Sequence, residues 1–471
     1  MHLGIAAARR LRSFVWCASA ALGLVAGLQQ TALAQDAQRP VCVAAADADT
    51  GYVHTMGDVL GGRVLIGAGN GLFLAHEVGG KITVSRAGDA DTGRVPATQA
   101  FAGGALIGGW NGVFLAREAS GKVTIARVGG LDTGRPDTGP PDTGPVYLMH
   151  SLASAGLLIG AENGLFLARE RDGKVSVAPA SDVSIARVYH MLAWPSGGVL
   201  VADARGWFLV RVAGGAVTVD AAGDVDTGPV LAVYDFRPGT KLIRSMAGVF
   251  VARDEGGKVT VRRADGAPTG VIGAVHELPG VGMLVHAEKG WFVARPRSDG
   301  AAASSVAGPD TGSVLQMKAL PGSGVLIQGR NGWFLARMKD DKVTFTPVAD
   351  VEITGRVYAA DDWPAGGVLI GSDKGLFLAR ETNGNVTIAP VGGADTGYVH
   401  VIRALPGGGT LIGSRKGWFV ARETGGKFAL TPAGQADAGR VNHMRDFGGA
   451  VLIGGESGLF VATAAPGCGS R

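Results

Sequence analysis

Long apolar runs are almost missing from this chain of 471 residues. The longest extends from Phe14 to Leu28, about 15 residues, whereas a membrane-spanning helix needs roughly 20. Three arginines between residues 9 and 12 precede it, and a small-residue site ending at Ala34 follows it. This order predicts a secretory signal over residues 1–34 and a mature chain that begins near Gln35. We therefore expect a periplasmic or secreted protein without membrane insertion.

An excess of charge of one sign is also missing. The chain has 44 Lys and Arg against 40 Asp and Glu, and the predicted signal contains three of the arginines and no acid. A nucleic-acid partner would need a clustered basic face, so none is expected. Helical periodicity with caps is not found either, which disfavours solenoids built from helix pairs.

Glycine, in contrast, is abundant, with 78 residues, and it recurs at fixed offsets. The pattern Gly, apolar residue, Phe occurs ten times, beginning at Gly71, Gly112, Gly164, Gly206, Gly248, Gly290, Gly332, Gly375, Gly417 and Gly458. Successive copies lie 41 to 43 residues apart, except for one interval of 52. Periods of about 40 to 45 residues with short strands are typical of four-stranded propeller blades.

Each copy divides into four runs of strand-forming residues separated by turn residues. In residues 355–393 these runs are GRVYAADDWP, AGGVLIGSD, KGLFLARET and NGNVTIAPVGG, which we name strands a, b, c and d. Strand c is apolar throughout, with Phe in all ten copies, then Leu or Val, then Ala or, once, Val210. A strand without alternation is buried on both faces, so the ten Phe are expected to pack between blades.

The two ends of the repeat array complement each other. Residues 40–46, PVCVAAA, resemble a strand d, whereas the last copy ends after its strand c at residues 458–462. The N-terminal strand is therefore expected to complete the last blade, a closure that a stacked β-solenoid does not need. The predicted fold is all-β, a single closed β-propeller of ten four-stranded blades over residues 35–471. Cys42 and Cys468 lie near this junction, and in an exported protein they predict one disulfide.

The stretch from strand b into strand c resembles the two-component regulator propeller repeat. It reads AGLLIGAENGLFLAR at residues 155–169, GGVLIGSDKGLFLAR at 366–380 and GGTLIGSRKGWFVAR at 408–422. The resemblance implies an extracytoplasmic propeller that senses ligands ahead of a signalling module. The chain departs from the family in having no kinase part or transmembrane segment, and Ser, Ala or Gly where the family prefers Thr. The resemblance therefore bears on the fold more than on signalling.

The triplet Asp-Thr-Gly occurs eight times, at Asp49, Asp91, Asp132, Asp137, Asp142, Asp226, Asp310 and Asp395. The copy at Asp310 matches the aspartic-protease signature, but repetition between strands d and a indicates turns in which Asp accepts a backbone N–H. Calcium at the DxDTG copies is the alternative, and two carboxylates supply too few of the six to eight oxygens. No metal or cofactor is expected. The proline-rich run at residues 135–146 is expected to be an extended surface loop.

Three other patterns have structural interpretations. Arg ends strand c in eight copies, often followed by an acid, which is typical of a solvated rim, with a binding ring as the alternative. Trp207, Trp291, Trp333 and Trp418 alternate with Leu and Val in strand c, which indicates core packing rather than sugar stacking. Six histidines of strand a lie 14 to 17 residues before the repeat Gly, so they do not share one position and a convergent metal site is disfavoured.

Strand a is innermost in a propeller and lines the channel. Fourteen residues before the repeat Gly, the third to ninth copies have His150, Leu192, Tyr234, His276, Lys318, Asp361 and Arg403. A structural position is expected to repeat its residue, so this variation indicates either a ligand site or the freedom of a solvated channel. The six polar residues of this set are the candidate ligand-binding residues, and no catalytic residue is predicted.

A repeated core with varying tips describes a scaffold. The leading hypothesis is a monomeric, non-enzymatic propeller outside the cytoplasm that binds a small ligand, a glycan or an envelope protein. The alternative is a propeller enzyme such as a polysaccharide lyase or glycoside hydrolase, with Asp235, Glu277, Asp361 and Asp362 as carboxylates at the channel mouth. A structural adhesin or assembly component is a third possibility.

Overall fold

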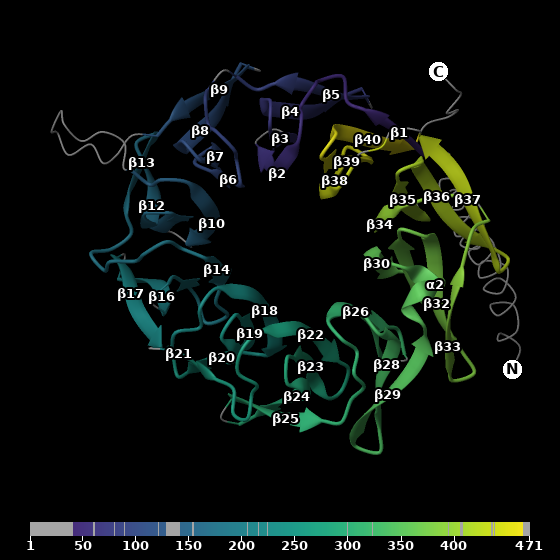
Figure 1. Ribbon diagram of the computed structural model, residues 1–471. Coiled ribbons are helices and arrows are strands. Elements are labelled where there is room, and N and C mark those ends of the chain that lie inside the picture. Colours follow the sequence, from purple (N-terminus) through teal and green to yellow (C-terminus); the bar gives the residue numbers. More distant parts are fainter. Residues whose placement is uncertain are drawn as a thin grey trace, which may run out of the picture.

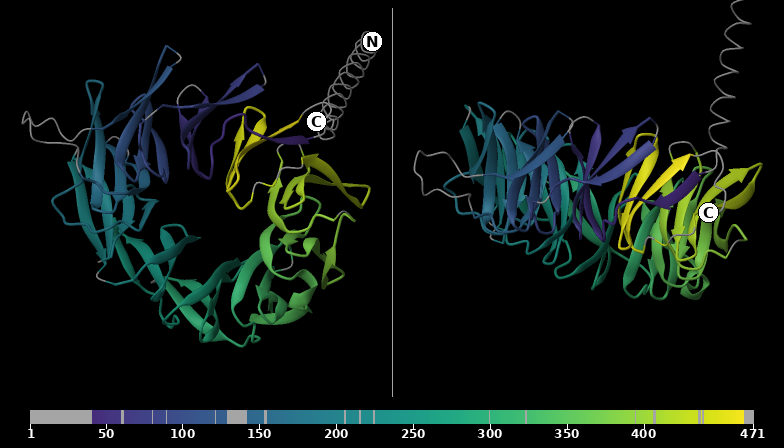
Figure 2. Two further views of the ribbon diagram at one scale, coloured as in Figure 1. Left: turned by 45° about the horizontal axis from the view of Figure 1, so that its top comes forward. Right: turned by 90° about the horizontal axis from the view of Figure 1, so that it is seen from above.

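The computed structural model describes residues 41–464, apart from residues 60, 61, 80, 89, 121, 129–141, 153, 154, 205, 215, 224, 299, 323, 394, 406, 407, 435, 436 and 438. Ten four-stranded antiparallel sheets stand around a central hole and form one ring (Figure 1). Figure 2 shows the same ring from two further directions, with all blades side by side. The predicted all-β propeller of ten blades is confirmed. The predicted signal, Cys468 and most of the loop at residues 135–146 lie outside the described residues.

Each blade has its strands in the predicted order from the channel outward. The innermost strands are β2 (Val53–Val59), β6 (Ala97–Phe101), β10 (Val146–Leu152), β14 (His190–Ala193), β18 (Val230–Arg237), β22 (Ile272–Leu278), β26 (Val314–Leu320), β30 (Val357–Asp362), β34 (Val399–Ala404) and β38 (Val441–Phe447). The second strands are β3 (Arg63–Ala68), β7 (Gly104–Gly109), β11 (Gly156–Ala161), β15 (Val199–Ala202), β19 (Thr240–Ser245), β23 (Gly282–Ala287), β27 (Gly324–Gly329), β31 (Val368–Ser372), β35 (Thr410–Ser414) and β39 (Ala450–Gly455).

The outer half of each blade begins at the repeat glycine or directly after it. The third strands are β4 (Gly71–Val78), β8 (Gly112–Ala119), β12 (Gly164–Arg171), β16 (Trp207–Ala213), β20 (Gly248–Glu255), β24 (Gly290–Arg297), β28 (Gly332–Lys339), β32 (Gly375–Thr382), β36 (Gly417–Thr424) and β40 (Gly458–Ala464). The outermost strands are β5 (Lys81–Arg86), β9 (Lys122–Arg127), β13 (Lys174–Pro179), β17 (Ala216–Gly223), β21 (Lys258–Arg263), β25 (Gly300–Val306), β29 (Lys342–Ala349), β33 (Asn385–Pro390), β37 (Lys427–Gly434) and β1 (Val41–Ala45). We number the blades 1 to 10 from β2 to β38.

The first and last strands of the chain close the ring. β1 is the outermost strand of blade 10 and pairs antiparallel with β40, with Val43 opposite Ala462 and Cys42 opposite Thr463. Val43 is buried in the cluster that contains Phe460. The predicted closure by the N-terminal strand is therefore confirmed. The Cys42–Cys468 disulfide stays a prediction, because Cys468 is not among the described residues.

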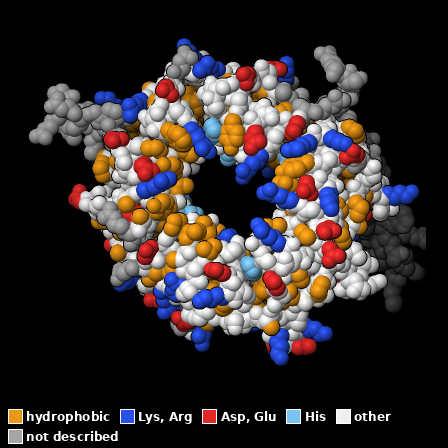
Figure 3. Space-filling view, in the orientation of Figure 1, with side chains coloured by type: hydrophobic (Ala, Val, Ile, Leu, Met, Phe, Trp, Pro, Cys, Tyr) orange, Lys and Arg blue, Asp and Glu red, His pale blue; other side chains and the backbone are white. Residues whose placement is uncertain are grey.

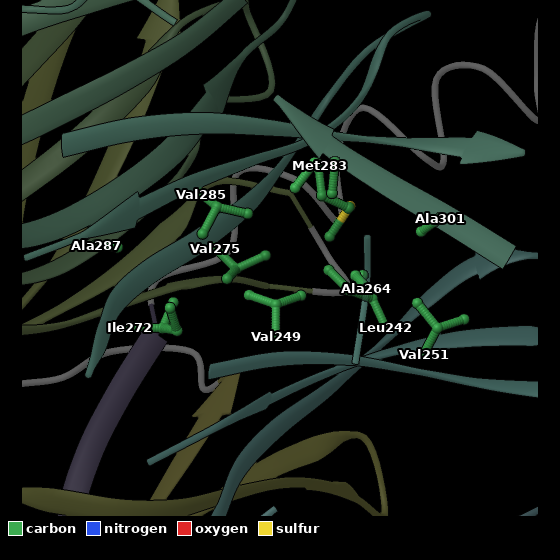
Figure 4. Packing of buried hydrophobic residues seen from close by; sticks show 12 residues of the cluster. Leu242, Val249, Val251, Ala264, Ile272, Val275, Met283, Val285, Ala287 and Ala301 are labelled. Carbon is green, nitrogen blue, oxygen red and sulfur yellow. The ribbon is translucent and has the colours of Figure 1, made fainter. Parts of the chain in front are cut away.

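The core consists of ten apolar clusters, one between each pair of neighbouring blades, and each contains one of the ten strand c Phe residues. Figure 4 shows one of them, which contains Leu242 and Val251 of blade 5 and Val275 and Val285 of blade 6. The expectation that these Phe pack between blades is confirmed. Stability therefore comes from stacking neighbours, because no blade buries either face alone.

Helix is almost missing from the described residues. The single helix there, α2 (Val351–Thr354), is one turn long and lies between blades 7 and 8, where other copies have Asp-Thr-Gly. Among the described residues, no helix is long and apolar enough to cross a membrane.

Candidate functional site

The six candidate residues occupy one register position on the channel wall. Each lies on an innermost strand opposite the central Leu of the second strand, as in the pairs Lys318 with Leu326 and Arg403 with Leu411. The same holds for His150, Tyr234, His276 and Asp361. Counting back from the repeat Gly therefore selected structurally equivalent positions.

The count of fourteen residues back from the repeat Gly was applied to the third to ninth copies, so it left out blades 1, 2 and 10. There the equivalent residues, opposite Leu65, Leu106 and Leu452, are Gly57, Gln99 and Arg445. Gln99 and Arg445 lie 13 rather than 14 residues before the repeat Gly, because one turn is shorter. We call all ten residues, from Gly57 to Arg445, the channel ring.

Ion pairs connect consecutive blades along part of the channel ring. Lys318 Nζ lies 3.3 Å from Asp361 Oδ1 and 3.2 Å from Asp362 Oδ1. Arg403 Nη2 lies 3.2 Å from Asp446 Oδ1 in the next blade. In Figure 3, Lys and Arg side chains border part of the central hole. The structure thus brings Lys318 of blade 7 and Asp361 of blade 8 together. Each of the other four candidates lies on a further blade of its own.

The two histidines of the channel ring share one hydrogen-bond arrangement. His150 Nδ1 lies 3.0 Å from the carbonyl oxygen of Ser151, and His276 Nδ1 lies 2.9 Å from that of Glu277. A carbonyl only accepts, so Nδ1 is the donor in both hydrogen bonds. Both rings are therefore oriented by the backbone of their own strand. Tyr234 instead packs against the apolar cluster between blades 5 and 6.

The six Asp-Thr-Gly triplets that lie among the described residues are turns, as predicted. In the copy at Asp310, Oδ1 accepts the Gly312 N–H at 3.0 Å, and Gly312 has φ of 62°. The Thr between them, Thr311, is 1% exposed. Asp49 and Asp226, which belong to two of the DxDTG copies, accept the N–H of their own turn glycine in the same way. No group of three or more metal-ligating side chains is found in the described part of the chain.

The rim arginines and the strand c tryptophans connect parts of the ring. Arg117 Nη2 donates to Gly173 O in the next blade at 2.6 Å, and Arg337 Nη1 donates to Gly384 O at 3.3 Å. The four tryptophans are buried, and Trp207 Nε1 donates to the turn Thr227 at 3.2 Å. The core interpretation of the tryptophans is therefore confirmed.

A second group of polar residues was not found from the sequence. It lines a cavity of about 960 Å³ where β30, β34 and β38 begin, and it includes Arg356, Tyr358, Tyr398, His400 and Arg415. Two of these, Tyr358 and His400, occupy β-bulges at the second residue of their strands. A bulge turns a side chain away from its regular direction, which counting along a strand does not reveal. The only signal in the sequence is the recurrence of RVY at 187–189 and 356–358, and of GYVH at 51–54 and 397–400.

No family model and no curated protein matches this chain. Among solved structures, the extracellular domain of BT4673 from B. thetaiotaomicron, described as part of a hybrid two component system, has a TM-score of 0.33 and 14% identity. The match covers 90% of this chain and 58% of that chain, so this chain spans less than two thirds of its length.

Other solved structures are similarly distant. PorZ, a surface component of the type-IX secretion system of Porphyromonas gingivalis, has a TM-score of 0.26 and 15% identity over 87% of this chain and 68% of that one. Sqt1 of Saccharomyces cerevisiae has a TM-score of 0.39 and 10% identity over 68% of this chain and 96% of that one. At these values no role transfers to this chain, and the repeat family stays a resemblance.

Proposed function

We propose that this protein is a non-enzymatic β-propeller that binds a ligand or partner outside the cytoplasm, with the binding site in the central channel. One observation supports the proposal most. The core positions repeat through all blades, whereas the channel ring changes residue type from blade to blade and presents donors, acceptors and both signs of charge. Such a ring supplies several different polar contacts to one bound molecule.

The energetics of the channel ring also favour binding over stability as its role. The side chains of Lys318 and Arg403 are 26% and 32% exposed, and their partners are more exposed still. Ion pairs of this kind contribute about 0 to 1 kcal/mol to folding. The blades are held together by the apolar clusters, so the fold does not require a particular residue at these positions.

The enzymatic alternative is less well supported. Of its four candidate carboxylates, Asp361 and Asp362 both face Lys318, and Asp235 pairs with Lys241. A glycoside hydrolase needs two carboxyl groups that flank the scissile bond, and three of the four candidates are instead held in ion pairs with lysines. These contacts support electrostatic partners rather than a catalytic pair.

The test begins with a thermal-shift screen of the purified protein against sugars, metals and envelope proteins. The variant with His276, Lys318 and Arg403 all replaced by Ala is then compared with the original protein for binding of the ligand that the screen identifies. We expect the triple variant to fold and to lose at least about tenfold in affinity, because each charged hydrogen bond contributes roughly 1.5 to 3 kcal/mol. The matched control is Arg117→Ala on the outer rim. Unchanged affinity in a folded triple variant would place the site elsewhere.

A further inference from the structure

The cavity at the start of β30, β34 and β38 has the composition of an anion site. Three arginines line it, Arg356, Arg415 and Arg440, together with two carboxylates, Asp437 and Glu456. These residues come from the turns that lead into three consecutive blades and from the loops between their second and third strands. With His400 neutral, the formal charge of the lining is +1.

Two neighbouring tyrosine rings orient two of the arginines. The guanidinium carbon of Arg356 lies 5.2 Å from the ring centroid of Tyr358, and that of Arg415 lies 5.0 Å from the centroid of Tyr398. The two tyrosine rings lie against each other, with centroids 4.1 Å apart and planes tilted by 38°. Cation–π contacts of this kind orient a guanidinium without using its N–H groups. Within the described residues, the three guanidinium groups form no ion pair or hydrogen bond. Their donors therefore stay available to a ligand.

His400 supplies an independent sign of a missing partner. Its side chain is only 7% exposed and lines the cavity, and its Nε2 has no hydrogen-bond partner. Asp437 Oδ1, the nearest acid, is 3.9 Å away, and this oxygen accepts the Gly439 N–H at 2.9 Å. A buried ring nitrogen without a partner is uncommon in native proteins and indicates a group that binds there.

The cavity also contains acceptors for hydroxyl groups. Glu456 Oε2 accepts the Arg440 N–H at 3.2 Å, which leaves other lone pairs of Glu456 and of Asp437 free to accept. The hydroxyl of Tyr398 remains a neutral donor because burial and the hydrogen bond with Tyr358 raise its pKa to about 12. A ligand with one oxyanion and several hydroxyls satisfies both the arginines and the carboxylates.

Blade 4 offers a natural comparison. Arg187, Val188 and Tyr189 occupy the same positions as Arg356, Val357 and Tyr358, and Arg187 also lies over a tyrosine ring, that of Tyr147, at 4.8 Å. There, however, Glu162 lies 3.3 Å from Arg187 and accepts the Tyr147 hydroxyl at 2.7 Å.

The acid that pairs with Arg187 belongs to the preceding blade and lies two residues before its repeat Gly. In blade 7, which precedes Arg356, this position is occupied by Arg330. The arginine of blade 4 is therefore paired with an acid, whereas Arg356 has a base at the equivalent position.

We propose that the cavity lined by Arg356, Tyr398, His400 and Arg415 binds an acidic saccharide, whose carboxylate or sulfate contacts the arginines while its hydroxyls contact Asp437 and Glu456. This site is separate from the channel ring and does not depend on it. Its volume, about 960 Å³, is at the upper end of the range of small-ligand pockets, roughly 300 to 1,000 Å³, and so suits more than a single ion.

The test is isothermal titration calorimetry at low salt with four probes: a hexuronic acid disaccharide, a sulfated disaccharide, a neutral disaccharide and inorganic phosphate. We expect at least one acidic disaccharide to bind with a stoichiometry of one and about tenfold more tightly than the neutral disaccharide and phosphate. Added salt should weaken this binding. The preferred acidic probe identifies whether the anionic group is a carboxylate or a sulfate.

Variants locate the site. Arg356→Ala and Arg415→Ala should each weaken binding by about tenfold or more, because each removes a charged donor. The matched control Arg187→Ala should leave binding unchanged, and so should the triple Ala variant of the channel ring, which separates this site from the channel site. Equal binding of neutral and acidic disaccharides, or no binding of either acidic probe, overturns the proposal. Equal losses from Arg187→Ala and Arg356→Ala overturn it as well, and phosphate binding as tightly as the disaccharides overturns the saccharide assignment.

Discussion

Ring closure by β1 can be tested through Val43. This residue is 5% exposed and lies opposite Ala462 of β40. Val43→Asp replaces about 1.5 to 3 kcal/mol of side-chain burial with an unpaired buried carboxylate, whose cost is several kcal/mol. β1 has only five residues, and each regains about 1 to 2 kcal/mol of backbone entropy on release. Release of β1 is therefore cheaper than burial of the charge, and we expect β1 to detach while the other nine blades stay intact.

The assay is hydrogen exchange by mass spectrometry on peptides that cover residues 41–45 and 458–464. Both should lose protection in Val43→Asp. The matched control is Val177→Asp, because Val177 has the same register opposite Ala168 in blade 3 and is 1% exposed. β13, which contains Val177, is held by the chain at both ends, so this control should leave residues 41–45 protected. Full protection of residues 41–45 in Val43→Asp, or equal loss in both variants, would refute closure by a terminal strand.

Two further predictions concern stability. Asp310→Ala should lower the free energy of unfolding by about 0.5 to 1.5 kcal/mol, because it removes the acceptor for the Gly312 N–H, whereas Asp310→Asn keeps an acceptor and should be nearly neutral in urea unfolding. Burial lowers the pKa values of His190, His286 and His400, so below the ordinary value of 6.5 the unfolded chain binds more protons. Stability should therefore fall from about pH 7 to pH 5.5, by at most about 1.4 kcal/mol per pH unit for each histidine, and a urea midpoint that stays constant contradicts this.

The sequence predicted the blades and their strand order well, because few other residues can replace the ones that form the core and the turns. The Phe of strand c must fit between two packed blades, and the glycine of each described Asp-Thr-Gly turn has positive φ, as at Gly312. The Phe recurs in every blade and the turn precedes six of the ten, so both appear in the sequence as a period. The last copy supplies three of the four strands that a blade needs, so the extra strand at the N-terminus could be recognised as its complement.

The channel ring was predicted only where the distance from the repeat Gly is constant. From the third to the ninth copy the count gave the correct register, and it did not reach Gln99 or Arg445, where a turn of different length shifts the number by one. The strands themselves carry no mark of this shift, because a solvated position on an inner strand imposes no residue type. Register at such positions is fixed by pairing with the buried second strand rather than by the residue itself.

The cavity at blades 8 to 10 could not be predicted, because no single repeat contains it. Tyr358 and His400 lie on bulges, and Arg415 belongs to a loop that reads as an ordinary solvated turn. One difference between the ion-paired cluster at Arg187 and the cavity is the replacement of an acid, Glu162 in blade 3, by a base, Arg330, at the same position of blade 7. Whether an arginine has an acid beside it depends on the turns of the neighbouring blade, so this difference can be recognised only in the folded ring.

The apolar core and the polar positions are separate parts of the molecule, which explains how one ring accommodates the two proposed sites. The apolar clusters between blades hold the ring together, and the charged side chains of the channel ring and of the cavity are not part of them. Exposed polar side chains at turns and inner strands change the free energy of folding by only about 0 to 1 kcal/mol each, so their identity is little constrained by stability. Charges that converge without partners in one part of such a ring, as they do at Arg356 and Arg415, therefore require an explanation outside the fold, and a bound anion supplies it.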